Sequence, residues 1–343
     1  DVADNPTRAA FEVLNTGSEF SLTGGTFNVL RGVTGAANES LEINPETYDL
    51  TGSTITLFEN LGADYGETYF NISSAIPLNN LTIANSIDLP NVNLLNRSLE
   101  VNNLTINANQ VLEANIFNLT VNGDWANNGS YVNTNTETIL SGTTTQTVSG
   151  SGSFSLYDLL KQGAGQANIG VDLDVSHDLF VTAGTLALGT NAINLSNDAY
   201  IQSSVTSTGG NGLNFQGASN QDLFGLANST ISIGTITISN ASGVDIPDGN
   251  GYDFEVDTEL RLNGGVFDIG GSLLEVRETA TITAVQPFGV SNMVQTNSSF
   301  TDNGLKIDFF GVDADTSVFF PVGELKYTPV DFVLNASTSA GTI

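Results

Sequence analysis

Oxygen-bearing side chains offer the most chemistry in this sequence, and a dense group of them lies between residues 245 and 253. Asp245, Asp248, Asn250 and Asp253 are interspersed there with two glycines. Carboxylate and amide oxygens on a flexible loop are ligands that Ca²⁺ prefers. The spacing differs from that of the twelve-residue calcium loop, and no bidentate glutamate follows. The segment therefore predicts either a calcium site or an ordinary acidic turn.

Two further pairs of acids are separated by one residue in the sequence: Asp172 with Asp174, and Asp313 with Asp315. On a β-strand this spacing places both side chains on one face. Solenoid polysaccharide lyases combine acid-bound calcium with a lysine or arginine base, and Arg261 lies near the acidic segment. We expect Arg261 to be an outward-pointing, solvated side chain instead.

Three aromatic residues are candidates for stacking on a sugar ring. Trp125 and Tyr131 lie close together in the sequence, and Tyr252 lies inside the acidic segment. Both residue types combine an apolar ring with a polar tip, which suits a sugar-binding surface as well as a packed interior. If the three rings converge in one groove with the acids of 245–253, glycan binding is favoured. Rings that are scattered or buried favour a structural role.

Several classes of catalytic site are excluded by composition. The chain has one histidine, His177, and no cysteine. Sites that need several imidazoles are therefore excluded, and so is thiol chemistry. No phosphate-binding or dinucleotide-binding glycine motif occurs in a strand–helix context. We expect the protein not to be an enzyme, and we expect His177 to be a surface turn residue.

The charge balance is strongly acidic although charged residues are few. Of 343 residues, 37 are acidic and 8 are basic, which gives a net charge of −29, and only 13% are charged. Binding to nucleic acid needs clustered lysine and arginine, so nucleic acid is not an expected partner. No run of 18 apolar residues occurs, so we expect no membrane-spanning helix. A hydrophobic content of 40% is enough for a substantial core.

Short runs that alternate apolar and polar residues recur along the chain, such as Leu104-Thr-Ile106, Leu119-Thr-Val121 and Ile236-Thr-Ile238. A period of two predicts strands with one buried face. Gly, Asn, Asp and Ser separate these runs at short intervals and supply turn positions. The sequence therefore predicts an all-β fold.

Two segments recur at long spacing, which indicates stacked, self-similar units. Residues 179–195 match 260–276, and residues 140–150 match 215–225. Apolar residues and glycines are kept in the first pair of copies, whereas its polar residues change. We favour a parallel β-solenoid with a superrepeat of about 80 residues, coils of roughly 20–27 residues and asparagines stacked at successive corners. An array of β-sandwiches is the alternative.

The pattern predicts three regions along the chain. Residues 1–20 form an N-terminal cap or edge, residues 21–295 form the solenoid, and residues 296–343 form a C-terminal β-sandwich-like module or cap. The last region is set apart by longer, more aromatic strands, such as Tyr327–Leu334. We expect the chain to be a portion of a longer protein.

Several of these segments together resemble a known family. Residues 117–131 end a strand in Gly-Asp-Trp, residues 140–150 contain Thr-Gln-Thr-Val, and residues 179–201 follow with Gly-Thr-Leu-Ala-Leu-Gly-Thr-Asn. This order resembles the repeats of large secreted surface proteins of Bacteroidota, including gliding adhesins. Residues 319–330, with Phe-Pro-Val-Gly and Tyr-Thr-Pro-Val, resemble a segment that closes such regions. The resemblance implies export by type IX secretion and display at the cell surface, and it supplies no catalytic residues.

We therefore expect an extracellular structural or adhesive repeat segment that serves as a stalk or presentation scaffold. The partners expected are the outer-membrane secretion machinery and, at the surface, glycans or further copies of the chain. One alternative is a glycan-binding or lyase-like β-helix that uses acid-bound calcium. The other is a subunit that assembles end to end into a surface filament. We expect no cofactor, with Ca²⁺ at the acidic segment as the alternative.

Overall fold

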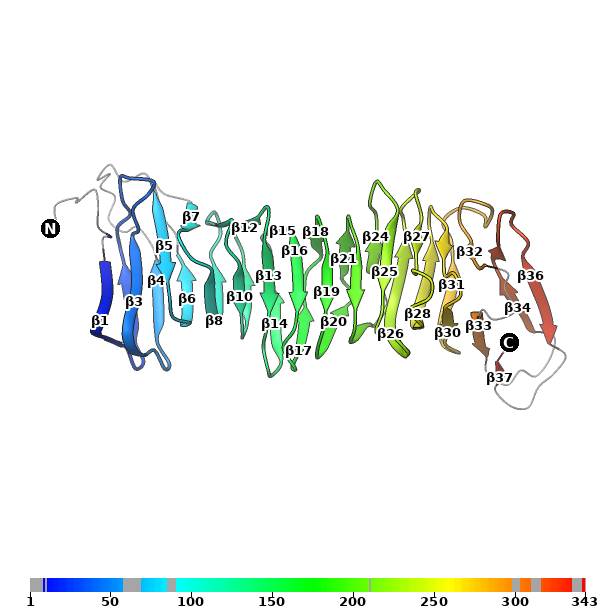
Figure 1. Cartoon of the computed structure of the whole chain (residues 1–343), viewed down its shortest axis with the longest axis horizontal. Helices are drawn as coiled ribbons and strands as arrows, with labels where there is room; N and C mark the ends of the chain where they lie inside the picture. The colour runs from blue at the N-terminus through cyan, green and yellow to red at the C-terminus, as the bar shows by residue number, and fades with distance from the viewer. Residues whose placement is uncertain are drawn as a thin grey trace. The chain divides into compact units, whose positions relative to one another are not determined.

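The computed structural model describes Ala9 and residues 11–57, 69–84, 91–209, 211–297, 303–309, 316–334 and 341–342. In these ranges the chain is all-β, and its strands stack in parallel as a β-solenoid, which confirms the predicted fold class (Figure 1). Two compact units, an N-terminal unit of residues 1–171 and a C-terminal unit of residues 172–343, are described separately. No helix in the described ranges is long and apolar enough to cross a membrane.

Each coil of the N-terminal unit has up to three strands, one on each side. One side is formed by β1 (Phe11–Ser21), β3 (Leu41–Asp49), β5 (Phe70–Ser74), β7 (Asn91–Leu94), β9 (Val111–Asn115), β12 (Ser130–Asn133) and β15 (Ser153–Leu156). A second side is formed by β2 (Thr26–Val29), β4 (Thr54–Leu57), β6 (Leu78–Ile83), β8 (Leu99–Ile106), β11 (Trp125–Asn127), β14 (Gln146–Ser149) and β17 (Gln166–Ile169). The first half of β8 continues into a third side with β10 (Leu119–Val121), β13 (Glu137–Leu140) and β16 (Asp158–Lys161).

The C-terminal unit repeats this three-sided plan. Its first side contains β18 (Leu173–Val175), β21 (Ala192–Leu195), β24 (Gly212–Phe215), the second halves of β26 (Ser229–Ile238) and β28 (Tyr252–Leu262), and β31 (Thr281–Thr283). Its second side contains β19 (Leu179–Val181), β22 (Ala199–Ile201), β25 (Gln221–Phe224), β27 (Val244–Asp245), β29 (Phe267–Asp268), β32 (Val294–Gln295) and β35 (Val322–Gly323). Its third side contains β20 (Thr185–Gly189), β23 (Ser204–Ser207), the first halves of β26 and β28, β30 (Leu273–Val276) and β33 (Gly304–Phe309).

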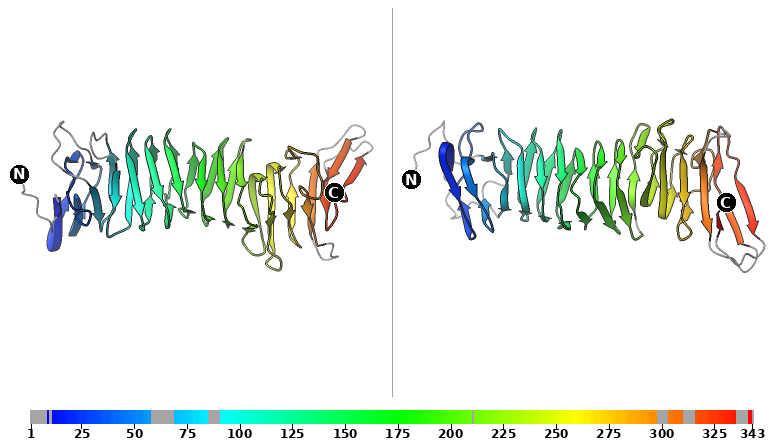
Figure 2. Two further views of the ribbon diagram at one scale, coloured as in Figure 1. Left: turned by 90° about the horizontal axis from the view of Figure 1, so that it is seen from above. Right: turned by 60° about the horizontal axis from the view of Figure 1, so that its bottom comes forward.

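The ends of the parallel ladder differ from the predicted boundaries. Parallel pairing continues past residue 295, because β33 pairs with β30 and β35 pairs with β32. At the start of the chain, β1 pairs in parallel with β3, so the described residues from Phe11 onward form a strand of the ladder, which corresponds to the edge alternative for residues 1–20. Among the described residues, antiparallel pairs of strands are found after residue 295: β34 (Thr316–Phe320) pairs with β36 (Val330–Leu334), and β33 pairs with β37 (Gly341–Thr342). Isolated antiparallel bridges occur earlier, as between Val33 and Tyr69. The views in Figure 2 show the same strand order from two further sides.

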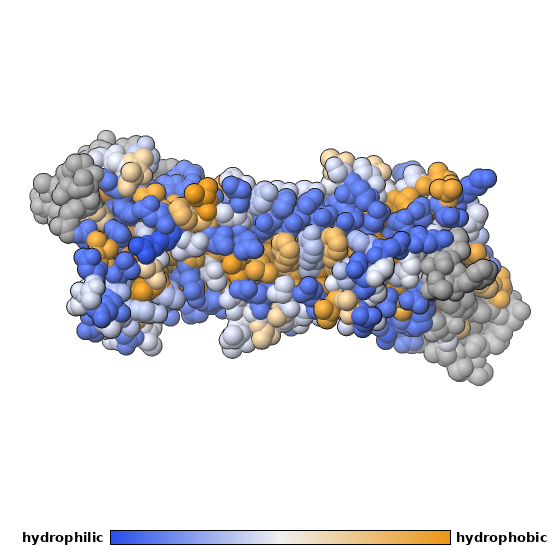
Figure 3. Space-filling view, viewed as in Figure 1, coloured by the Kyte–Doolittle hydropathy of each residue, from blue (hydrophilic) through white to orange (hydrophobic). Residues whose placement is uncertain are grey.

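Alternation within each strand builds the core. Inward residues of successive coils stand in register and are buried, as in the column Leu173, Ile193, Leu213, Ile236 and Leu260. A coil in this column therefore takes 20 to 24 residues, within the predicted range. Outward positions carry mostly amides, hydroxyls and acids, and Figure 3 shows polar residues interspersed with small apolar patches on the face drawn. Each coil is stabilised mainly by its immediate neighbours.

Asparagine side chains of successive coils bond to one another, as predicted, but the two pairs lie within strands and not at the predicted corners. The Asn103 Nδ2 donates to Asn80 Oδ1 at 2.7 Å in the N-terminal unit. In the C-terminal unit, Asn214 Nδ2 donates to Asn194 Oδ1 at 2.9 Å. Each amide has both a donor and an acceptor, so it bonds in register along a parallel ladder without changing residue type. This accounts for the recurrence of asparagine beside the strands.

The matching segments 179–195 and 260–276 lie on different sides of the coil. The first copy begins on β19 of the second side, whereas the second copy begins in β28 on the first side. Leu179 and Leu260 are nevertheless both fully buried, and Gly189 and Gly270 both have a positive φ, of 57° and 52°. The period of 81 residues is therefore one side short of four coils. Packing and turns are repeated, while the direction that the outward residues face is not.

Candidate functional site

The four predicted calcium ligands do not converge. Asp245 lies on β27, where its Oδ2 accepts a hydrogen bond from Asn220 Nδ2 at 2.8 Å. Asp248 Oδ1 accepts from the Gly271 backbone nitrogen at 2.9 Å, and Asp253 Oδ1 accepts from the Leu273 backbone nitrogen at 2.8 Å. Among the described residues, these carboxylates do not form a group of three with oxygens within 4.8 Å of one another.

These carboxylates therefore accept hydrogen bonds from the neighbouring coils, which is a structural role. Asn250 donates only to the Asp248 carbonyl within the loop, at 3.2 Å. Two of the three carboxylates bond to the backbone of the following coil. These contacts correspond to the acidic-turn interpretation of the segment.

The other acidic candidates bond in the same way where the structure describes them. Asp172 Oδ1 accepts from the Ala192 backbone nitrogen at 2.8 Å, and Asp174 Oδ1 accepts from Asn194 Nδ2 at 2.8 Å. Asp313 and Asp315 lie outside the described residues. Arg261 Nη2 lies 2.6 Å from Glu259 Oε2, on an outward position of β28. The arginine thus lies on an outward position, as expected, but its side chain is only 26% exposed and pairs with an acid on its own strand.

The sugar-stacking prediction is wrong for Trp125 and Tyr131, because both side chains point into the core. Their relative exposures are 1% and 0%. The Trp125 ring meets Tyr131 edge to face with centroids 4.9 Å apart, and it meets Phe154 at the same separation. Tyr131 Oη lies 2.9 Å from Thr138 Oγ1, and burial raises the pKa of the phenol to about 12. The two rings form an internal aromatic cluster of the N-terminal unit.

Tyr252 belongs to a column of aromatic side chains on the outside of the C-terminal unit. Phe180 and Tyr200 stack with centroids 4.8 Å apart and an interplanar angle of 12°. Tyr200 and Phe224 stack at 4.5 Å and 5°, and Tyr252 closes the column edge-on to Phe224. Because these rings stack face to face, each ring covers the face of its neighbour, and the ring edges are directed outward. The interior of the column therefore offers no open ring face to a sugar.

An acidic column runs beside the aromatic column, and its first three acids each precede an aromatic residue of that column by two positions. It contains Asp178, Asp198, Asp222, Asp245 and Asp268, which follow one another in register from β19 to β29. The Asp178 carboxylate accepts a hydrogen bond from the Asp198 backbone nitrogen at 3.1 Å. The Asp198 carboxylate in turn accepts from the Asp222 backbone nitrogen at 2.8 Å. Parallel strands are about 4.8 Å apart, so like charges face one another along the column.

Burial, reinforced by neighbouring carboxylates, raises the pKa of two members of the column. Partial burial is the main cause of the raised pKa of Asp222, and the carboxylates of Asp198 and Asp245 add to it. Burial also raises the pKa of Asp245; the Asn220 hydrogen bond opposes this effect, while Asp268 and Asp248 reinforce it. The pKa of Tyr200 is raised by burial and by three acids of the column. The second side of the C-terminal unit is therefore a surface of concentrated negative charge.

Comparison of the chain with known proteins does not identify it. No family model, curated protein or solved structure matches.

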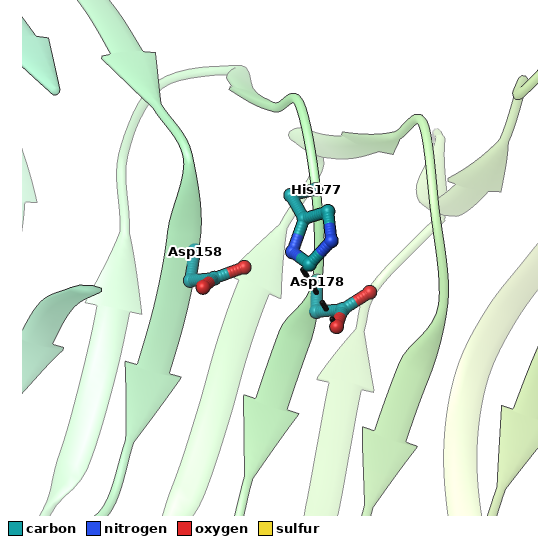
Figure 4. Close-up of side chains that lie close together, drawn as sticks. All are labelled: Asp158, His177 and Asp178. Carbon is teal, nitrogen blue, oxygen red and sulfur yellow. Dashed lines mark ion pairs between the residues drawn. The ribbon is translucent and has the colours of Figure 1, made fainter. Parts of the chain in front are cut away.

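The single histidine occupies the position expected for a surface turn residue. His177 lies in the bend between β18 and β19, and its side chain is 39% exposed. Figure 4 shows its imidazole beside Asp178. Its Nδ1 lies 3.5 Å from Asp178 Oδ2, so the imidazole contacts the first acid of the column.

Lys161 is a buried base of the N-terminal unit. It occupies an inward position of β16, in register with Leu140 of β13, and it is fully buried. Its Nζ donates to the Gly163 carbonyl, and burial lowers its pKa.

The sequence contains a signal for the two columns that the sequence analysis missed. An aspartate followed two residues later by an aromatic residue occurs at Asp178, Asp198 and Asp222, at intervals of 20 and 24 residues. These intervals equal the coil length, so the recurrence places both residue types on one side of successive coils.

Replacing Asp222 with asparagine is expected to stabilise the C-terminal unit by roughly 0.5 kcal/mol at neutral pH, a value that allows for solvent screening. The folded-state pKa of Asp222 is raised, so its charged form costs stability above that pKa. As the pH falls through the raised folded-state pKa the gain should shrink, and below about 4, the unfolded-state value, the carboxyl is protonated in both states and the gain should vanish. Urea unfolding of wild type and variant between neutral pH and that value measures the difference.

Asp174→Asn is the matched control, because Asp174 bonds Asn194 and lies outside the acidic column. An equal gain in both variants at neutral pH would show that general net charge, and not the column, is responsible.

Proposed function

We propose that this chain is an extracellular structural segment of a bacterial surface protein, which spaces or presents adhesive modules outside the cell. The observation that carries the proposal is the displacement of the repeat copies by one side of the coil. Because equivalent outward residues of the two copies face different directions, the repeat does not duplicate a surface site. What it preserves is a coil that can stack on another coil.

The composition of the surface supports the same role. Amides, hydroxyls and acids cover the coils, and the net charge of −29 favours solubility and repulsion between neighbouring chains. A stack of coils stabilised by nearest neighbours can be lengthened without redesigning its core, which suits a stalk. In this proposal, the resemblance of the repeats to Bacteroidota surface proteins makes type IX secretion the export route and places the chain among gliding-type adhesins.

Antibodies raised against the chain are expected to label intact cells of the organism that produces it. Brief treatment of those cells with a protease that does not enter them should remove the label. An antibody against a cytoplasmic protein is the control, and it should bind only after permeabilisation. Labelling that requires permeabilisation would overturn the extracellular proposal.

A further inference from the structure

An open groove of about 310 Å³ lies on the N-terminal unit, a volume at the lower end of small-ligand sites. The residues that bear on its chemistry are Tyr48, Asp49, Pro77, Asn79, Asn102 and Asn122. None of the sequence-predicted site residues lines it. Its neutral amides and exposed tyrosine distinguish it from the acidic column of the C-terminal unit.

The long strand β3 forms one wall of the groove. Only Leu41, Glu42 and Ile43 pair with β5, whereas the distal half of β3 pairs with β1, with Phe20 opposite Tyr48. Tyr48 is 49% exposed, which leaves much of its ring in solvent. Asp49 Oδ1 accepts from the Thr51 backbone nitrogen at 3.0 Å, and this bond fixes the turn that follows and lowers the pKa of Asp49.

A column of three asparagines forms the other wall. Leu78 pairs with Val101 and Val101 pairs with Val121, so the residues that follow them, Asn79, Asn102 and Asn122, stand in register. Successive amides are therefore about 4.8 Å apart. The outer two are oriented by bonds to the protein: Asn79 Nδ2 donates to Ser53 O at 3.0 Å and Asn122 Nδ2 donates to Glu100 Oε1 at 2.8 Å. Asn102, at the centre, is exposed.

We infer that this groove binds a neutral carbohydrate chain. The exposed ring of Tyr48 provides an apolar face against which a sugar ring can lie. The amides opposite provide both donors and acceptors, which match the hydroxyl groups of a sugar. Their regular spacing along the solenoid suits a polymer more than a single compact ligand.

The charge of the groove decides between neutral and charged polymers. Its lining contains Asp49 and no lysine or arginine, so polyanionic glycans are repelled. One carboxylate among three neutral amides is a weak basis for recognising a polycation. A neutral polysaccharide is the class that remains.

Binding is tested by calorimetric titration of the full chain with cellohexaose, xylohexaose, mannohexaose and chitohexaose. We expect at least one of these to bind. Tyr48→Ala should weaken that binding roughly tenfold, the effect of losing one aromatic partner. Tyr48→Phe, which keeps the ring, should bind like wild type, and Asn102→Ala should also bind more weakly.

Asn135→Ala is the matched control, since Asn135 is an exposed asparagine of the same unit outside the groove. Circular dichroism of each variant verifies that the fold is kept, as expected for exposed positions. Absence of binding to all four hexaoses, or equal affinity of wild type and Tyr48→Ala, would overturn the inference. Tighter binding of a basic peptide than of any hexaose would overturn it in favour of a cationic ligand. The inference does not rest on the scaffold role, because cell-surface labelling is unaffected by either result.

Discussion

Replacing Trp125 with alanine is expected to lower the free energy of unfolding of the N-terminal unit by about 3–5 kcal/mol. Trp125 is the only tryptophan and is 1% exposed. Its ring contacts both Tyr131 and Phe154 edge to face, so alanine would remove the centre of this cluster. The backbone of β11 is held between β8 and β14, so it cannot move inward to fill the cavity. Urea unfolding followed by circular dichroism measures the loss.

Trp125→Phe separates packing from hydrogen bonding. The indole Nε1 has no hydrogen-bond partner within the described part of the chain, so phenylalanine removes volume but no bond. We expect it to cost clearly less than alanine, because most of the aromatic contact is kept. If both variants lose the same small amount of stability, the ring does not pack as the structure shows.

The parallel solenoid could be predicted because its signals are local and repeated. Each strand carries its own alternation, and asparagines and glycines at successive corners recur at the coil length. The lengths of the coils could be bounded in the same way. The side on which each strand lies could not be predicted, because coil lengths vary between 20 and 24 residues in one column. That variation conceals the shift by one side between the repeat copies.

The inward direction of Trp125 illustrates why individual sites were less predictable than the fold. The strand that carries Trp125, β11, and the preceding strand, β10, are each only three residues long, and a corner at Gly123 separates Trp125 from the alternating run Leu119-Thr-Val121. A corner can reset the phase of alternation, so the sequence does not show whether the next residue points inward. The Tyr48 groove was unpredictable for a related reason, since it depends on how far β3 extends past its pairing with β5.

The second pair of repeat copies keeps a polar residue, in contrast to the first pair. Gln146 and Gln221 occupy equivalent positions, and both are 1% exposed. Gln146 Oε1 accepts from the Gly142 backbone nitrogen, and Gln221 Oε1 accepts from the Gly217 backbone nitrogen. Each amide also donates to two backbone carbonyls of the preceding coil. A buried glutamine that ties two coils together explains why this polar residue recurs without any catalytic role.

Replacing Gln146 with glutamate is expected to lower the free energy of unfolding of the N-terminal unit by about 3–5 kcal/mol at neutral pH. The wild-type amide donates to Val121 O at 3.2 Å and to Gly123 O at 2.7 Å. A carboxylate has no hydrogen to donate, so a buried charge would face two carbonyl oxygens. Gln166→Glu is the control, because Gln166 is exposed on β17 of the same unit and should lose little. Equal losses in the two variants would contradict the role assigned to Gln146.

The pH dependence of the Gln146→Glu variant tests the mechanism of this loss. Burial beside two carbonyl oxygens should raise the folded-state pKa of the new carboxyl above its unfolded value of about 4.3. Below the unfolded value the group is protonated in both states and can donate one hydrogen bond, so part of the lost stability should return. As the pH rises through the folded-state pKa, that stability should be lost again. A loss independent of pH between neutral pH and about 4 would show that shape, and not the missing donor and buried charge, accounts for the effect.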